Sequence, residues 1–279
     1  DLLPPGSACL AVAEGGPVRG MPRSGWFWLI LGGLYFFVPL AATAEFSLKE
    51  GDAYSFGPYK EIFNDPQFRD TFFLSLKLAV ATIIVSLLLF IPTVYWVHLR
   101  LPRLRTAVQF LSALPFVVPP IVLIVGLLYV YNYQWVPSSY LGSPYYLVPG
   151  YVVLSFPFMF FALDNAFRAI DVHTLTEASQ SLGAGWSRTL WRVILPNISA
   201  GAIAGAFLTF ALVMGEFTMA SLALFTTFPT YINYIGQTKA NPAAALTIIS
   251  FGITWLALLG ILMVGRRPGR GTVQVGGTR

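Results

Sequence analysis

The sequence is poor in the residues that build disulfides, metal sites and soluble surfaces. It contains one cysteine, Cys9, which excludes a disulfide framework and a cysteine-rich metal site within these residues. Its two histidines, His98 and His173, are too few for most zinc sites. Only 10% of the 279 residues are charged, whereas soluble globular proteins carry about 25%. These shortages exclude a secreted disulfide scaffold, a disordered chain and an ordinary cytosolic enzyme.

Motifs of nucleotide binding and of hydrolysis are also absent. No G-x-x-x-x-G-K-[ST] loop occurs, and the chain has no Gly-Lys dipeptide. Neither the H-E-x-x-H zinc motif nor the G-x-S-x-G nucleophile motif is present. An intramembrane enzyme would need such a nucleophile–base pair or a metal cluster. The sequence therefore favours a function other than catalysis.

Apolar residues, in contrast, are abundant and grouped into long runs. They make up 56% of the chain, and the mean hydropathy is +0.69. A helix that crosses a bilayer needs about 20 apolar residues, and a helix satisfies its own backbone polar groups. The sequence therefore predicts an all-α membrane protein with six transmembrane helices. We place them at Trp26–Ala44, Phe72–Val97, Ala107–Tyr131, Tyr145–Phe167, Ile198–Leu224 and Ala243–Val264.

Lys and Arg are distributed unevenly between the two sides that this topology defines. The cytoplasmic side of a membrane protein carries the excess of these residues. With six spans both termini share one side, and that side would hold twelve of the 17 basic residues. We therefore predict cytoplasmic termini. The twelve are Arg19, Arg23, Arg100, Arg103, Arg105, Arg168, Arg188, Arg192, Arg266, Arg267, Arg270 and Arg279.

The chain divides into four parts on this topology. Residues 1–20 precede Met21 and are rich in Gly and Pro, as in an unstructured N-terminal extension or an expression remnant. Residues 21–70 hold the first helix and an extracytoplasmic loop, residues 71–265 form a core of five helices with a cytoplasmic loop at 168–197, and 266–279 form a cytoplasmic tail. The first helix has an alternative interpretation as a cleaved signal peptide, because Ala42-Thr43-Ala44 follows its apolar run.

The third and fifth predicted helices contain the most informative residues. Pro119-Pro120 breaks the third, either as a static kink or as a moving hinge. In the fifth, a stripe at helical spacing combines small residues, which permit close helix approach, with the carboxylate of Glu216. An ionisable residue inside a membrane is a functional candidate, although Glu216 could also reach the outer headgroups or accept a bond between helices. The stripe is Gly201, Gly205, Thr209, Leu212 and Glu216.

Aromatic residues cluster in and before the loop at 132–146, where they favour either an interfacial belt or a vestibule that binds cations. Tyr131 lies at the start of this cluster. We therefore take Glu216, Thr209 and Tyr131 as candidate residues of a substrate pathway or gate.

The cytoplasmic loop between the fourth and fifth helices is patterned. Thr174 and Glu177 predict a capping box at the start of a short helix. Gly183 suits the left-handed residue that follows such a helix. A second short helix is predicted from Ser187 to Leu195 and would end at Pro196. The loop is either an ordinary connection or an ordered docking element.

This loop carries a family resemblance. Glu177-Ala178-Ser179 is followed after three residues by Gly183 and, after nine more, by Val193–Pro196. The spacing resembles the EAA loop of ABC-importer permeases, in which Ala stands at the position of Ser179 and Ile at that of Val193. The resemblance covers 72–264 and is most similar to polyamine (spermidine/putrescine) permeases, with iron(III), phosphonate and sulfate branches close behind.

The resemblance implies a type I ABC importer permease in the prokaryotic inner membrane. Such a subunit pairs with a second permease, here expected to be a different chain, and with two ATPase subunits that bind ATP and Mg. A substrate-binding protein delivers the solute, and neither nucleic acid nor a cofactor of the permease itself is involved. The resemblance assigns coupling to Glu177, Ala178, Ser179, Gly183, Leu195 and Pro196. An oligomeric secondary transporter or channel is the alternative.

Overall fold

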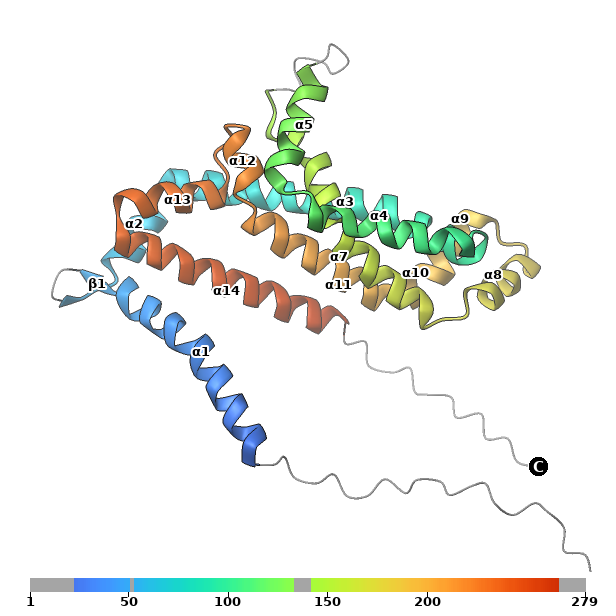
Figure 1. Ribbon diagram of the computed structural model, residues 1–279, viewed down its shortest axis with the longest axis horizontal. Helices are drawn as coiled ribbons and strands as arrows, with labels where there is room; N and C mark the ends of the chain where they lie inside the picture. Colours follow the sequence, from blue (N-terminus) through green and yellow to red (C-terminus); the bar gives the residue numbers. More distant parts are fainter. Residues whose placement is uncertain (1–22, 51–52, 133–141, 266–279) are drawn as a thin grey trace, which may run out of the picture.

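The computed structural model describes residues 23–50, 53–132 and 142–265, and within them the chain is almost entirely helical. The predicted extension at 1–20, the tail at 266–279 and part of the aromatic loop lie outside the described residues. Long helices run side by side along an elongated bundle (Figure 1). The helices α8 and α9 lie at one end, called here the hairpin end, and α2 and α13 lie at the other, called the outer end.

The elements follow one another in a nearly continuous helical order. A two-residue antiparallel ladder, β1 (Lys49–Glu50) with β2 (Ala53–Tyr54), interrupts it near the start. The helices are α1 (Arg23–Ser47), α2 (Gly57–Asn64), α3 (Pro66–Leu99), α4 (Arg105–Val117), α5 (Pro120–Asn132), α7 (Val148–Arg168), α8 (Val172–Ser181), α9 (Trp186–Thr189), α10 (Leu195–Asn197), α11 (Ser199–Gly215), α12 (Thr218–Leu222), α13 (Phe228–Thr238) and α14 (Ala240–Gly265). Short 3-10 turns cover Pro102–Leu104 and Pro144–Leu147, and a π-helical turn covers Leu190–Ile194.

Four of these segments are single helices long and apolar enough to cross a membrane: Gly25–Ser47, Pro66–Leu99, Pro144–Arg168 and Ala240–Ala257. Two bent pairs bring the number in the described residues to six if each pair is one span. The predicted break at Pro119-Pro120 is confirmed, because α4 and α5 meet there at 100°. Val118 is extended at this bend, as expected for a residue near a proline pair. The predicted third span is therefore made of two helices joined at a sharp bend.

The fifth predicted span is too long at its outer end. Helix α11 ends at Gly215, and Glu216 leaves the helical conformation with φ −79° and ψ 113°. The chain then turns into the short helix α12 instead of continuing to Leu224. Glu216 therefore does not belong to the helical stripe that the sequence predicts.

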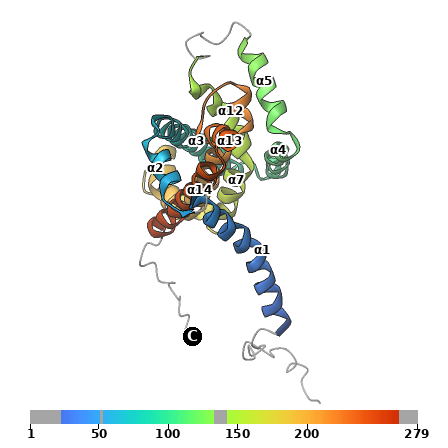
Figure 2. The same ribbon diagram turned by 90° about the vertical axis from the view of Figure 1, so that its left-hand side faces the viewer.

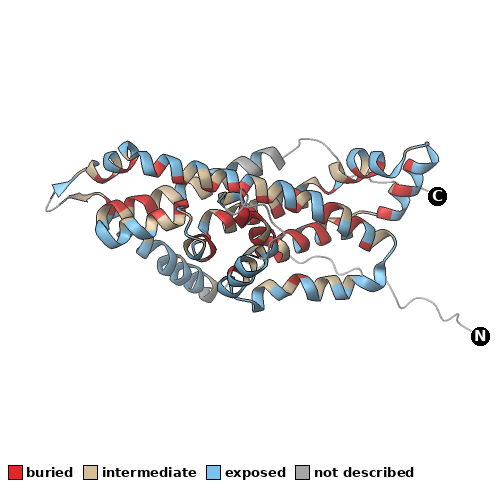
Figure 3. Cartoon of the chain, turned by 90° about the horizontal axis from the view of Figure 1, so that it is seen from above, coloured by how far each residue is buried: buried red, intermediate tan, exposed pale blue. Residues whose placement is uncertain are grey.

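The core is built around α7, which packs against α3, α11, α4 and α5. Buried residues concentrate along the middle of the bundle (Figure 3). Gly201 and Gly205 let α11 approach α7, because a Cβ on Gly201 would lie 2.7 Å from the Ala162 carbonyl oxygen and one on Gly205 would lie 2.7 Å from Met159 Sδ. The small residues of the predicted stripe thus form a close helix–helix contact inside the bundle.

Helix α1 lies at the margin of this bundle. None of its most apolar window is buried, and Figures 1 and 2 show it diverging from the other helices along its length. It packs against α14, where the Asn241 side chain donates to the carbonyl oxygens of Phe46 at 3.0 Å and Lys49 at 2.6 Å. The last turn of α1 is thereby fixed to the outer end.

Candidate functional site

The loop predicted to couple to a partner forms a hairpin of two helical arms, which we call the coupling hairpin (residues 171–197). Its first arm, α8, begins one residue after Asp171, whose Oδ1 accepts from the Thr174 amide at 3.1 Å and whose Oδ2 accepts from the Thr174 hydroxyl at 2.7 Å. The bonds from the Thr174 hydroxyl and amide hold the pKa of Asp171 below its usual range. The predicted capping box is wrong, because Thr174 already lies inside the helix and Asp171 is the N-cap.

Gly183 has the left-handed conformation that the sequence predicts, with φ +78°. It follows the end of α8 at Leu182, and the Ala184 amide closes the turn on the Ser179 carbonyl oxygen at 3.1 Å. A Cβ on Gly183 would meet no atom within 4 Å. Backbone conformation, and not crowding within this chain, therefore requires glycine here.

The second arm runs through Pro196 instead of ending there. Helix α9, the π-helical turn and α10 follow one another from Trp186 to Asn197, and the arm then meets α11 at 79°. Pro196 closely follows the π-helical turn in this arm, and a proline inside a helix removes an amide donor and favours a break in the helical hydrogen-bond pattern. Leu195 and Pro196 are both half-buried at this elbow.

Polar contacts fix one face of the hairpin to itself and to the bundle. The Ser179 and Thr189 hydroxyls lie 3.0 Å apart and join the two arms. The Thr176 hydroxyl lies 3.1 Å from that of Tyr95 on α3. Ser179, which departs from the family pattern, thus has a buried hydrogen bond that alanine could not make.

The opposite face of α8 points away from the bundle. Leu182 is 89% exposed, Ala178 and Glu177 are exposed, and Leu175 is half-buried. Exposed apolar side chains beside a carboxylate, held on an ordered helix, are suited to contact with another protein.

At the outer end, Glu216 caps a helix. Its side chain is 9% exposed, and its Oε1 and Oε2 accept from the Met219 amide at 2.9 and 3.1 Å in the first turn of α12. The buried Tyr151 hydroxyl interacts with the same carboxylate. The sequence left open whether Glu216 serves transport or accepts a structural hydrogen bond. Its observed contacts are structural hydrogen bonds.

The other two pathway candidates, Thr209 and Tyr131, lie on α11 and α5. Thr209 is fully buried, and its hydroxyl has no hydrogen-bond partner in the described part of the chain. Tyr131 packs on Tyr146 with ring centroids 4.8 Å apart, and Tyr146 lies 6.1 Å from the Phe225 ring. The roles of Thr209 and Tyr131 in a pathway remain predictions.

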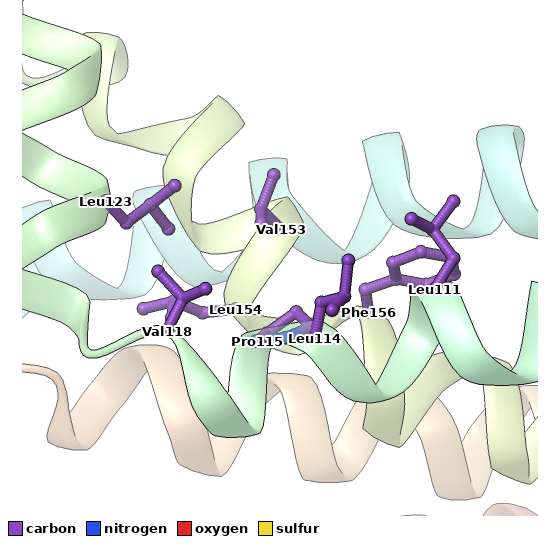
Figure 4. A pocket seen from close by; sticks show the side chains of 8 residues that line it. All are labelled: Leu111, Leu114, Pro115, Val118, Leu123, Val153, Leu154 and Phe156. Carbon is purple, nitrogen blue, oxygen red and sulfur yellow. The ribbon is translucent and has the colours of Figure 1, made fainter.

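An apolar cavity beside the α4–α5 bend has a volume of about 380 Å³ (Figure 4). Its lining is apolar, so it suits neither an anion nor a cation. No group of three metal-ligating side chains occurs in the described residues. The lining residues are Leu111, Leu114, Pro115, Val118, Leu123, Val153, Leu154 and Phe156.

Sequence reasoning missed a buried carboxylate near the hairpin end. Asp164 is 1% exposed, although it lies inside the predicted span Tyr145–Phe167. The signal was available, because an acidic residue within a span is itself a functional candidate, and Arg168 follows at the spacing of a helical ion pair.

Comparisons with known proteins agree with this geometry. A family model described as "binding-protein-dependent transport system inner membrane component" matches residues 96–267. The molybdenum transport system permease protein ModB of Mycobacterium bovis is 28% identical over 92% of this chain and 98% of that protein. ModB of Azotobacter vinelandii is 35% identical over 52% of this chain and 67% of that protein. The spermidine/putrescine transport system permease protein PotB of Haemophilus influenzae is 28% identical over 70% of this chain and 73% of that protein.

A solved structure shares the fold. A chain of a bacterial ABC transporter involved in the import of the acidic polysaccharide alginate superposes with a TM-score of 0.67 and 17% identity, over 88% of this chain and 95% of that one. The resemblance and the permease fold expected from the loop motif are thereby confirmed.

Proposed function

Because the chain belongs to the family of binding-protein-dependent transport system inner membrane components, we propose that it forms half of the translocation pathway of an importer for a small oxyanion of the molybdate class. The chain is a multi-pass inner-membrane subunit without catalytic activity of its own, like the permease relatives it matches. Transport is driven by ATP hydrolysis on partner subunits.

The hydrogen bonds of Glu216 are the observation that favours an anion over a polyamine as the substrate. A polyamine pathway would use an available carboxylate near the outer end, but both Glu216 oxygens accept from the Met219 amide. The positive end of a helix dipole already offsets a charge placed there. A relative that aligns over 92% of this chain is a molybdenum transport system permease protein. Polyamine transport remains the second candidate, supported by the PotB relative.

Uptake of labelled molybdate tests the substrate. The complete transporter, with its native binding protein and ATPase, is reconstituted into proteoliposomes loaded with ATP. We expect ATP-dependent accumulation of molybdate and none of putrescine. Accumulation of putrescine without molybdate would replace the proposal by the polyamine alternative.

The coupling hairpin is the proposed docking site for the ATPase. Glu177, Ala178 and Gly183 face outward from α8 and its turn, while Ser179 holds the two arms together. Leu195 and Pro196 form the elbow through which the hairpin joins α11. Two ATPase subunits would dock in the full transporter, one on this hairpin and one on that of the second permease, which we propose to be a different chain.

A substrate-binding protein at the outer end completes the proposed assembly. Affinity purification of the tagged chain in mild detergent, followed by mass spectrometry, tests its composition. We expect a P-loop ATPase and a second permease. A chain that purifies alone or only with itself would favour the channel or carrier alternative.

A further inference from the structure

Asp164 lies one turn before the hairpin end of α7, and its side chain is 2% exposed. In the part of the chain that the structure describes, it and Glu216 are the buried acidic residues. A carboxylate withdrawn from water is stable only when charge partners and hydrogen-bond donors surround it. The identity of those donors therefore shows what the carboxylate holds together.

The donors to Asp164 come from three helices. His98 on α3 donates from Nε2 to Oδ1 at 2.8 Å, since an ionised carboxylate can only accept. Arg168 on α7 donates from Nε at 2.9 Å and from Nη2 at 2.6 Å to Oδ2. From α4, Arg105 Nη2 lies 3.2 Å from Oδ1, and Gln109 Nε2 lies 3.3 Å from Oδ2. Asp164 thus ties α3, α4 and α7 at one point.

Helix α4 also packs on α7 through apolar side chains, such as Phe116 against Phe158 with ring centroids 5.5 Å apart, but little of it is buried. Of its 13 residues only Ser112 is buried, and the Ser112 hydroxyl bonds within its own helix at 2.7 Å. The middle of α4 faces the apolar cavity of about 380 Å³, where packing contacts are missing (Figure 4). Arg105 and Gln109 therefore supply the polar attachment of α4 to α7 near the hairpin end.

The last turns of α3 connect this cluster to the coupling hairpin. Tyr95 meets Thr176 on α8, with 3.1 Å between the hydroxyls. Trp96 stacks on Trp186 of α9, with ring centroids 6.0 Å apart and planes 21° apart. His98, which bonds Asp164, follows two residues later on the same helix. Both arms of the hairpin thus contact α3 within one turn of the Asp164 cluster.

We propose that Asp164 is a positioning residue that passes movement of the coupling hairpin to α4 and, through the bend at Pro119, to α5. The path runs from α8 and α9 to the end of α3, through His98 to Asp164, and through Arg105 to α4. Because the other contacts between α4 and α7 are mainly apolar, loss of the Arg105 contact weakens the link between α4 and the hairpin without dismantling the core. This inference rests on the proposed docking of an ATPase on the hairpin.

The test removes the α4 side of the cluster. Arg105→Gln deletes the charged contact and leaves His98 and Arg168 on Asp164, while Arg103→Gln makes the same change at an exposed position two residues away. Both are made in the assembled transporter, with Cys9 replaced by Ser. A spin label is attached at Val125→Cys, a position of α5 that is 57% exposed. The readouts are ATP hydrolysis and the spectral change between nucleotide-free and ATP–vanadate states.

We expect the ATP–vanadate spectral change to be retained in Arg103→Gln and to fall about fivefold or more in Arg105→Gln, within the range of measured couplings between sites. ATP hydrolysis and co-purification of the ATPase should stay within about twofold in both. An unchanged spectral response in Arg105→Gln would overturn the inference. A parallel loss of response, hydrolysis and thermal stability would also overturn it, because a purely structural role would then explain the effect.

A second variant serves if Arg105→Gln does not assemble. Gln109→Leu removes only the bond at 3.3 Å, and we expect a smaller loss of the same spectral response with hydrolysis intact. The substrate does not enter these readouts, so a wrong substrate assignment leaves them unaffected. Absence of a co-purifying ATPase from the unaltered chain would contradict the proposed function itself, and the inference with it.

Discussion

Asp164 and Glu216 are both buried acidic residues, but their hydrogen-bond donors differ. Side chains from several helices donate to Asp164, whereas a backbone amide donates to Glu216. The Glu216 carboxylate accepts from the backbone amide of Met219, three residues on, and interacts with one side chain, the Tyr151 hydroxyl on α7. The Asp164 carboxylate accepts from four side chains on three helices. One group therefore shapes a local turn, whereas the other determines how separate helices sit against each other.

This difference predicts different responses to substitution. A helix cap needs an acceptor oxygen more than a full charge, so a neutral amide can replace Glu216 at modest loss. Two of the Asp164 partners, Arg105 and Arg168, are cationic, and removing the anion leaves them facing one another in a poorly solvated site. The following predictions test this contrast from the largest expected effect to the smallest.

Replacing each acid by leucine should separate the two most clearly. Asp164→Leu removes the anion that faces Arg105 and Arg168, and we expect a loss of about 3 kcal/mol of stability, the lower end for a broken buried ion pair, because both arginines are partly exposed. Glu216→Leu removes the acceptor of the Met219 amide and the partner of the Tyr151 hydroxyl but leaves no cations facing one another, and should lose about 1–2 kcal/mol. Thermal unfolding of the purified transporter in detergent measures both. Equal losses would show that the distinction between the two acids is wrong.

Gly183→Val tests the hairpin next to the Asp164 cluster. The left-handed backbone at φ +78° disfavours valine by about 1–2 kcal/mol, although no neighbouring atom obstructs it. We expect uptake to fall about tenfold or more while the chain stays in the membrane. The matched control is Gly185→Val, because Gly185 has an extended backbone at φ −72° and open surroundings. Normal uptake in Gly183→Val would show that this turn does not matter for coupling.

Glu216→Gln tests the cap at the outer end. The amide oxygen can still accept from the Met219 amide, so we expect a loss of about 0.5 kcal/mol and molybdate uptake within about twofold of the unaltered transporter. Unaltered uptake would agree with a structural role. A collapse of uptake with stability intact would show that the carboxylate charge serves transport and would favour a cationic substrate.

Ser179→Ala tests the buried contact between the hairpin arms. It removes one hydrogen bond, that to the Thr189 hydroxyl, at about 1 kcal/mol. It also restores the alanine of the family pattern, so assembly with the ATPase should persist. Hydrogen exchange over residues 172–190 should rise modestly, and unchanged exchange would mean that the arms are held together by packing alone.

The smallest expected effect is a change in hydrogen exchange of α8 at acid pH. Because the pKa of Asp171 is lowered by its bonds to Thr174, its stabilisation of α8 is present above the unfolded pKa of about 3.9 and is lost as pH falls through the lower folded value. Hydrogen exchange in α8 should therefore increase only below about pH 4. Asp171→Asn, which caps without ionising, should remove that dependence, and a pH effect that persists in it would come from another group.

Local features of the chain could be predicted where a residue type restricts or extends the φ angles of its own backbone. The bend at Pro119-Pro120 and the left-handed Gly183 follow from the restricted or permissive φ of proline and glycine, and both are confirmed. The N-cap of α8 was misplaced by three residues because aspartate and threonine are both favourable N-cap residues. The end of α11 was missed because apolar composition continues past Gly215, so hydropathy alone does not mark the turn.

The amino-acid sequence by itself determined the helical membrane class, the approximate spans and the ordered hairpin. These features depend on apolar runs and cap residues, whose effects involve only neighbouring residues in the sequence. Only the tertiary structure decided that Asp164 joins three helices and that Glu216 caps the start of α12. Whether Asp164 meets His98 and Arg105, and whether Glu216 meets Tyr151, depends on side chains from distant segments. Those encounters are determined by how the helices pack, and no local spacing specifies them.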